Sequence, residues 1–169
     1  MLELRKLSVD DGMDVYQMLQ DIPLDENGLQ NNANGLSYGE YKNWLIKKKQ
    51  ESELDGIVDG WKVPSTTYWL YADGVPVGFG KLRHCLTDAL QKVGGHIGYG
   101  IAPQYRGKGY GKELLRLLIG KAYDIGITRV LVTIRLDNKA SQAVALANGG
   151  VITEQTDERM LVWIDTKQA

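Results

Sequence analysis

Three glycines at alternate positions, Gly107, Gly109 and Gly111, separate a strand-like run from a helical pattern. Arg106 and Lys108 stand among them. The first N–H groups of a helix have no partner inside the helix, and the helix dipole favours negative charge at that end. Glycine also lets the backbone come close to a ligand. We therefore expect this loop to bind an anionic group, such as a phosphate, where a strand turns into a helix.

Two common phosphate-binding motifs do not fit this loop. The dinucleotide fingerprint requires Gly-x-Gly-x-x-Gly, whereas the glycines here are spaced Gly-x-Gly-x-Gly. A Walker loop requires Gly-Lys followed by Ser or Thr, and Lys108 is followed by Gly109. The spacing excludes both the Rossmann and the P-loop interpretation.

The composition is that of an ordinary globular protein, and we expect one domain spanning residues 1–169, with 43% hydrophobic and 24% charged residues. A formal net charge of -1 argues against a nucleic-acid partner. Cys85 is the only cysteine, so no internal disulfide can form. No run approaches the ~18 apolar residues of a membrane span, and the first residues lack an apolar signal core. We expect a cytoplasmic protein without a membrane partner.

Hydrophobic periodicity predicts the order of the elements. Helical spacing recurs at residues 13–19, 38–53, 109–125 and 138–147. Strand-like runs fall at residues 2–7, 66–71, 75–84, 95–102, 130–134, 151–154 and 160–164. This order predicts an α/β fold of the α+β type, with a mixed, mostly antiparallel central sheet of about seven strands flanked by about four helices.

Local patterns refine these expectations. Asp73-Gly74 predicts a hairpin between the second and third strands, with Val77 and Phe79 on one side of the return strand. Residues 21–36, rich in Asn, Gly and Asp, are expected to form a loop. In the strand at residues 95–102, isoleucines and a tyrosine alternate with Gly98 and Gly100, which leaves one face nearly bare. Such a face is typical of close approach by a ligand or another backbone.

At this point the chain resembles the GNAT superfamily of acyl-CoA N-acyltransferases, in a bacterial branch of predicted acetyltransferases. The family motif is Gln or Arg, two residues, Gly, one residue, then Gly or Ala, and residues 106–111 read Arg-Gly-Lys-Gly-Tyr-Gly. Asn138, followed by a helix and then by Asn148-Gly149-Gly150, matches a second family pattern. The resemblance is clearest over residues 66–152. It implies the acyl-CoA N-acyltransferase fold and acetyl-CoA as co-substrate.

The resemblance also implies which residues bind the cofactor. Backbone N–H groups of the loop would bind the pyrophosphate, with positive charge added by Arg106 and Lys108. The edge of the strand around Gly100 would pair with the peptide-like pantetheine arm. Asn138 would approach the thioester, or would simply cap its helix. The implied binding residues are Tyr99, Gly100, Ile101, Arg106, Gly107, Lys108, Gly109, Tyr110, Gly111, Lys112, Asn138 and Ser141.

The implied reaction is direct attack of a primary amine on the thioester. A base or a water chain must take the amine proton, and His96 is the candidate, with a structural histidine as the alternative. Family members often carry a tyrosine as general acid on the last helix, but Ala145 stands at that place. A thiolate with a pKa of about 8.5 needs at most modest help in leaving. No cluster of residues has the spacing of a metal site.

Two functions remain open from the sequence. The first is an N-acetyltransferase acting on a small-molecule or peptide amine, and the second is a non-catalytic acyl-CoA-binding sensor. Acidic and aromatic residues between 21 and 53, among them Glu26 and Glu40, suit a cationic amine or form a solvated loop. The apolar run at residues 160–164 predicts a homodimer paired through this strand.

Overall fold

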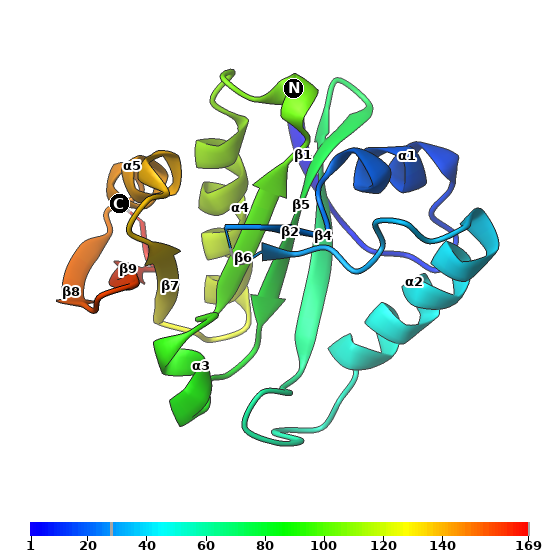
Figure 1. Cartoon of the computed structure of the whole chain (residues 1–169). Helices are drawn as coiled ribbons and strands as arrows, with labels where there is room; N and C mark the ends of the chain where they lie inside the picture. Colours follow the sequence, from blue (N-terminus) through cyan, green and yellow to red (C-terminus); the bar gives the residue numbers. More distant parts are fainter. Residues whose placement is uncertain (28, 169) are drawn as a thin grey trace.

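Four antiparallel strands form the first sheet in a computed structural model that describes residues 1–27 and 29–168. Their order is β1 (Leu2–Lys6), β4 (Ser65–Ala72), β5 (Val75–Arg83) and β6 (Ile97–Ile101) (Figure 1). All eight residues of β4 are buried, as expected for a central run of β-branched and aromatic side chains. Asp73 and Gly74 both have positive φ, at 50° and 84°, which suits the tight turn of the predicted β4–β5 hairpin.

Three further antiparallel strands form a second sheet in the order β7 (Arg129–Arg135), β9 (Arg159–Asp165) and β8 (Val151–Gln155). β7 adjoins β6 without a ladder between them. Because β9 is hydrogen-bonded on both sides, by β7 and by β8, it cannot pair with a second copy of the chain. The expectation that residues 160–164 pair across a dimer interface is therefore wrong, and a homodimer by any other route stays a prediction.

Helices cover both faces of the first sheet. α1 (Met13–Asp21) and α2 (Tyr38–Ser52) pack on one face, and α4 (Tyr110–Asp124) packs on the other (Figure 1). α5 (Lys139–Ala147) lies beside α4 and β7. α2 begins with the capping box of Ser37 and Glu40. The structure thus has two apolar cores, one on each face of the sheet.

The described residues contain nine strands and five α-helices, slightly more than the seven and four expected. The additions are short. Strands β2 (Asp25–Glu26) and β3 (Leu29–Gln30) form a hairpin in the segment expected to be a loop, and α3 (Asp88–Lys92) and a 3-10 turn (Pro103–Tyr105) occupy connections. Elements of two to five residues have too few positions to show a period, which is why the pattern missed them.

A bulge in β5 changes which face its residues occupy. Leu70 pairs with Gly78 and Tyr71 pairs with Pro76, so that Val77 has no partner on β4. Val77 joins the core beneath α4, while Phe79 joins the core beneath α1 and α2. The expectation that Val77 and Phe79 share a side is wrong, because one extra residue reverses the alternation.

Candidate functional site

β6 and β7 touch at one end and separate toward the other. The His96 N–H donates to the Leu131 carbonyl at 2.8 Å, and the Leu131 N–H donates to Nδ1 of His96 at 2.9 Å. The Gly94 N–H donates to Oγ1 of Thr133 at 2.9 Å. Beyond these three bonds no ladder joins the two strands. The separation leaves a gap in the middle of the combined sheet.

One edge of β6 faces the gap, and only its Ile101 carbonyl has a partner among the described residues, Nε of Arg106. The Ala102 N–H donates to the Val77 carbonyl at 2.9 Å, and antiparallel pairing then alternates along the strand. By that alternation the backbone groups of Tyr99 and Ile101 point away from β5 and into the gap. This is the strand edge that the sequence predicted for an extended, peptide-like ligand.

The glycine loop stands at the wide end of the gap. Gly107 and Gly109 have φ of 79° and 83°, a conformation that favours glycine, and Gly109 caps α4. No hydrogen bond among the described residues is donated by the backbone N–H groups of residues 107–112, the first of α4 included. The loop therefore presents a row of free donors at a positive helix end, as the sequence predicted.

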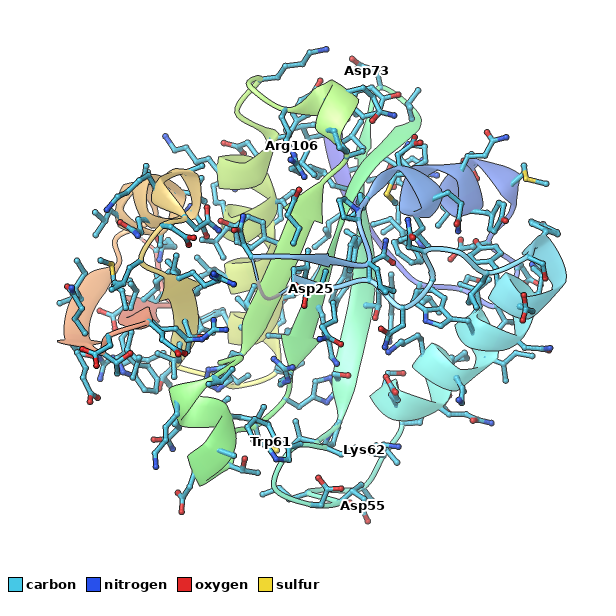
Figure 2. The ribbon with its side chains drawn as sticks, in the orientation of Figure 1. Asp25, Asp55, Trp61, Lys62, Asp73 and Arg106 are labelled. Carbon is cyan, nitrogen blue, oxygen red and sulfur yellow. The ribbon has the colours of Figure 1, made fainter. Side chains whose placement is uncertain are left out.

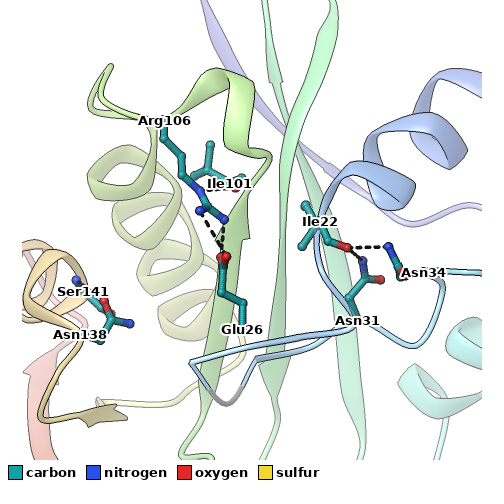
Figure 3. Close-up of polar contacts among 8 residues, drawn as sticks. All are labelled: Ile22, Glu26, Asn31, Asn34, Ile101, Arg106, Asn138 and Ser141. Carbon is teal, nitrogen blue, oxygen red and sulfur yellow. Dashed lines mark hydrogen bonds and ion pairs between the residues drawn. The ribbon is translucent and has the colours of Figure 1, made fainter.

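The Arg106 side chain, expected to add positive charge for the pyrophosphate, is bonded to other residues of the protein. Its Nε donates to the Ile101 carbonyl at 2.9 Å, and its two terminal nitrogens form a bidentate ion pair with Glu26 of β2 (Figure 3). Figure 2 shows Arg106 at one end of the sheet, with Trp61 and Lys62 at the opposite end. The guanidinium therefore fastens the β2–β3 hairpin to the loop, and its charge is already balanced by Glu26. Lys108 lies over the Tyr105 ring, with Nζ 5.8 Å from the ring centroid.

The start of α5 meets β6 across the gap. Asn138 caps α5 by accepting the Ser141 N–H on Oδ1 at 3.2 Å (Figure 3). Oγ of Ser141 and the Tyr99 hydroxyl lie 3.0 Å apart and share a hydrogen bond. Burial raises the pKa of Tyr99, and the bond to Ser141 opposes that shift. Tyr99 thus links β6 to α5 through a hydroxyl that keeps its proton at neutral pH.

A cavity of about 490 Å³ follows the gap and has the size of a small-molecule site. Of the predicted residues it is lined by Tyr99, Gly100, Ile101, Arg106, Gly107, Gly109, Tyr110, Gly111, Lys112, Asn138 and Ser141, but not by Lys108 or His96. The residues present fit an extended ligand with a phosphorylated end, because free N–H donors, open space at Gly107 and Gly109 and a free strand edge border one continuous cavity.

A comparison of the sequence with protein-family models agrees with this geometry. The family model described as "Acetyltransferase (GNAT) domain" matches residues 1–151. The chain belongs to the GNAT acetyltransferase family. A search of curated proteins finds no match to this chain.

Solved structures show the same GNAT fold at low sequence identity. RimL, a ribosomal L7/L12 α-N-protein acetyltransferase in complex with coenzyme A, is 17% identical with a TM-score of 0.71, over 98% of this chain and 96% of that one. YncA from Salmonella typhimurium, a putative acetyltransferase with acetyl-CoA, is 14% identical with a TM-score of 0.64, over 99% and 95%. Campylobacter jejuni N-acetyltransferase PseH, with acetyl coenzyme A, is 11% identical with a TM-score of 0.64, over 99% and 100%.

The predicted catalytic residue of this GNAT domain, His96, is buried and only 7% exposed. Its Nδ1 accepts the Leu131 N–H, so the imidazole satisfies a backbone donor at the point where β6 and β7 part. Burial and the nearby Arg83 lower the pKa of His96 from 6.5 to about 4. A ring that is neutral, hydrogen-bonded and outside the cavity lining does not support the role of general base, and supports the structural alternative.

His96 should make the stability of the protein depend on pH. The unfolded chain binds a proton on this histidine below pH 6.5, whereas the folded chain binds it only near pH 4, so stability is lost as the pH falls through this window. We expect a loss of up to about 3 kcal/mol in the free energy of unfolding between these pH values. Urea titrations of the wild type and of His96→Asn, whose amide oxygen can still accept the Leu131 N–H, measure it. An equal acid sensitivity in both proteins would contradict the assignment.

In α5, the residue that faces the cavity is one position earlier than the sequence motif predicts. Ala145 is fully buried in the core beneath α4, and Val144 lines the cavity in its place. No side chain at residues 144 or 145 can donate a proton. Three further residues of the cavity lining, Leu29, Lys81 and Arg83, were not expected from the sequence. For Lys81 and Arg83 the available signal was their alternation with Phe79.

Among the described residues, no helix is long and apolar enough to cross a membrane. No group of three or more His, Cys, Asp or Glu side chains in the described part of the chain is arranged to hold a metal ion. The acidic residues expected to face a cationic amine have other partners. Glu26 binds Arg106, Glu40 caps α2, and Asp21 accepts from Gln104 at 2.7 Å. A role for these carboxylates in binding a cationic amine therefore stays a prediction.

Proposed function

We propose that this protein is an N-acetyltransferase that transfers an acetyl group from acetyl-CoA to a primary amine in the cytoplasm. The observation that carries the proposal is the row of free N–H groups at the start of α4, which opens into a cavity along the free edge of β6. One end of this arrangement suits a pyrophosphate and the other suits an amide-containing arm. The family membership makes acetyl-CoA the ligand that combines these parts.

Each part of the cavity has a separate task. The N–H groups of residues 107–112 would bind the pyrophosphate, and the Tyr99 backbone and the Ile101 N–H would pair with the pantetheine amides. When bound, acetyl-CoA supplies an activated acetyl thioester. A β6 N–H in the gap would donate to the oxygen that becomes negative as the amine attacks. These roles rest on backbone geometry, which side-chain substitutions along the strand leave in place.

Proton transfer relies on water more than on a dedicated base. Among the described residues that line the cavity, Glu26 is the one carboxylate, and it is paired with Arg106. We therefore propose that the attacking amine loses its proton to water while its nitrogen bonds to the acetyl carbon and the carbon–sulfur bond breaks. The candidate donor to the departing sulfur is the Tyr99 hydroxyl, because its raised pKa keeps it protonated.

The competing function is an acyl-CoA sensor without catalysis. It is favoured by one observation, that neither Val144 nor Ala145 offers a proton donor on α5. The two functions share the cofactor site and differ in turnover alone. Binding and catalysis must therefore be measured separately.

The test is incubation with acetyl-CoA and a panel of primary amines, with release of free thiol as the readout. We expect thiol release with at least one amine, and a higher melting temperature with acetyl-CoA, since a ligand at ~100 times its Kd stabilises the native state by about 2.7 kcal/mol. Stabilisation without thiol release for any amine favours the sensor. If acetyl-CoA does not raise the melting temperature, both functions are wrong.

A further inference from the structure

Lys81 and Arg83 lie on the face of β5 that is turned away from α4. A Cβ placed on Gly80 would come within 2.5 Å of Leu118 in α4, so Gly80 faces that helix. Residues 79, 81 and 83 alternate with it and face the opposite side. Phe79 confirms this orientation, because it packs in the core beneath α1 and α2. The two cations therefore share one face of one strand.

This face forms the second compartment of the cavity, beneath the β2–β3 hairpin. Lys81 pairs with Gly98 across the β5–β6 ladder. The Leu29 side chain lies over the bare face of β6, 2.6 Å from a Cβ placed on Gly100 and 3.4 Å from one on Gly98. In Figure 1 the hairpin crosses in front of β5 and β6. The glycines thus make room for a hairpin side chain that roofs the compartment containing Lys81 and Arg83.

Neither cation has a carboxylate partner among the described residues. Arg83 donates from Nη1 to the Gly95 carbonyl at 3.0 Å, and no hydrogen bond or ion pair joins Lys81 to another described residue. The nearby acid, Glu51, is already paired with Lys48 at 3.2 Å. A largely buried cation without a counter-charge is unfavourable, because its desolvation is not compensated. Two such cations side by side in a cavity wall indicate a site for an anion.

The cofactor phosphates do not account for this pair. Gly98, opposite Lys81, lies three residues before Ile101, or about 10 Å along an extended strand. The glycine loop that would hold the pyrophosphate comes after Ile101 and leads into α4, on the other face of the sheet. Lys112, Arg135 and Arg159 also line the cavity, on α4, β7 and β9. Lys81 and Arg83 are therefore open to a separate anion, which the second substrate would carry.

We propose that Lys81 and Arg83 bind an anionic group of the acceptor, so that the substrate is an amine bearing a carboxylate or a phosphate. The inference rests on the proposed function, since it names the acceptor class of the same cavity. Cation-paired hydrogen bonds to carboxylate or phosphate are the strong ones in proteins. They would hold the acceptor beneath the hairpin and leave its amine free to reach the gap.

The charge of Lys81 gives this binding a pH dependence. Burial lowers the pKa of Lys81 to about 8, helped by the charges of Arg83 and Lys48 and opposed by Glu51. A bound anion favours the charged form and must raise this pKa. Above about pH 8 the free protein loses the lysine charge, so the KM of an anionic acceptor should rise there while that of a neutral analogue should not.

Matched acceptor pairs test the proposal. One pair is a free amino acid and its amide, and the other is O-phosphoethanolamine and ethanolamine. We expect kcat/KM to fall about 100-fold when the anion of the preferred acceptor is removed, and about 10- to 100-fold for Lys81→Gln or Arg83→Gln with the anionic acceptor. The pair with the larger preference distinguishes carboxylate from phosphate. Lys47→Gln, an exposed change of equal charge on α2, is the control and should behave as the wild type.

Two outcomes would overturn the proposal. One is a wild type that acetylates charged and neutral members of both pairs equally well. The other is a charge preference that survives in both Lys81→Gln and Arg83→Gln. If no amine releases thiol, the proposed function fails, and an NMR titration of ¹³C-methylated lysines decides the subsite independently. A rise in the pKa of Lys81 on addition of inorganic phosphate or acetate supports the site, and an unchanged pKa refutes it.

Discussion

Replacing Gly109 by aspartate is expected to abolish acetyl-CoA binding while the fold persists. A side chain at this position meets no atom within 4 Å, so it has room. The φ of 83° costs an aspartate about 1 kcal/mol, because this residue tolerates the left-handed region better than most. The added carboxylate, however, stands at the free N–H groups that would hold the pyrophosphate. Repulsion of about 3 kcal/mol per unit of charge, for charges about 5 Å apart, predicts a loss of affinity of more than about 100-fold.

The other end of the same helix offers a matched control. Gly126 follows α4, has a φ of 87° and also meets no atom within 4 Å. Gly126→Asp adds the same charge in the same backbone conformation, away from the cavity. Calorimetry should show acetyl-CoA bound by this variant and not by Gly109→Asp, with similar melting temperatures for both. Equal affinity of the two variants for acetyl-CoA would show that the start of α4 does not bind the pyrophosphate.

Replacing Gly95 by alanine is expected to be the more damaging change to stability. Gly95 has a φ of 61°, and a Cβ there would lie 2.4 Å from the Leu131 carbonyl oxygen. Because that oxygen belongs to the backbone of β7 and accepts the His96 N–H, it cannot move without loosening the point where β6 and β7 meet. The left-handed conformation and the overpacking together predict a loss of about 2–5 kcal/mol in the free energy of unfolding.

Gly74→Ala separates the cost of the left-handed conformation from the cost of overpacking. Gly74 has a φ of 84° in the β4–β5 turn and meets no atom within 4 Å, so alanine there carries the backbone cost alone, about 1 kcal/mol. Urea unfolding of both variants measures the difference. We also expect Gly95→Ala to bind acetyl-CoA more weakly, since the gap widens from this junction. Equal stability of the two variants would show that the close approach to Leu131 is unimportant.

Long, strongly patterned elements were predictable because their periodicity is local. The helices α2 and α4, the buried β7 and the β4–β5 hairpin lie where the spacing of apolar residues and the turn residues put them. The glycine loop was predictable for the same reason, since positive φ and a helix start are properties of a few consecutive residues. Family motifs then connected the loop to acetyl-CoA.

Side-chain roles at the site were less predictable, because they depend on partners far along the chain. His96 was a chemically sensible base until its ring was found bonded to the Leu131 backbone, 35 residues away. Arg106 looked available for phosphate and is instead paired with Glu26, 80 residues earlier. Ala145 lies in the core and Val144 in the cavity lining, a difference of one position on a helix that no count from Asn138 could settle.

The sequence by itself determined the fold class, the position of the glycine loop and the family, because each depends on local conformation and on short motifs. Only the tertiary structure decided the second compartment of the cavity. The unpaired Val77 shifts the alternation of β5, and the β2–β3 hairpin places Leu29 over Gly98 and Gly100. Together they bring Lys81 and Arg83 to the wall of a roofed compartment. A one-residue bulge reverses every side chain beyond it, and its position depends on pairing with another strand, which no single segment encodes.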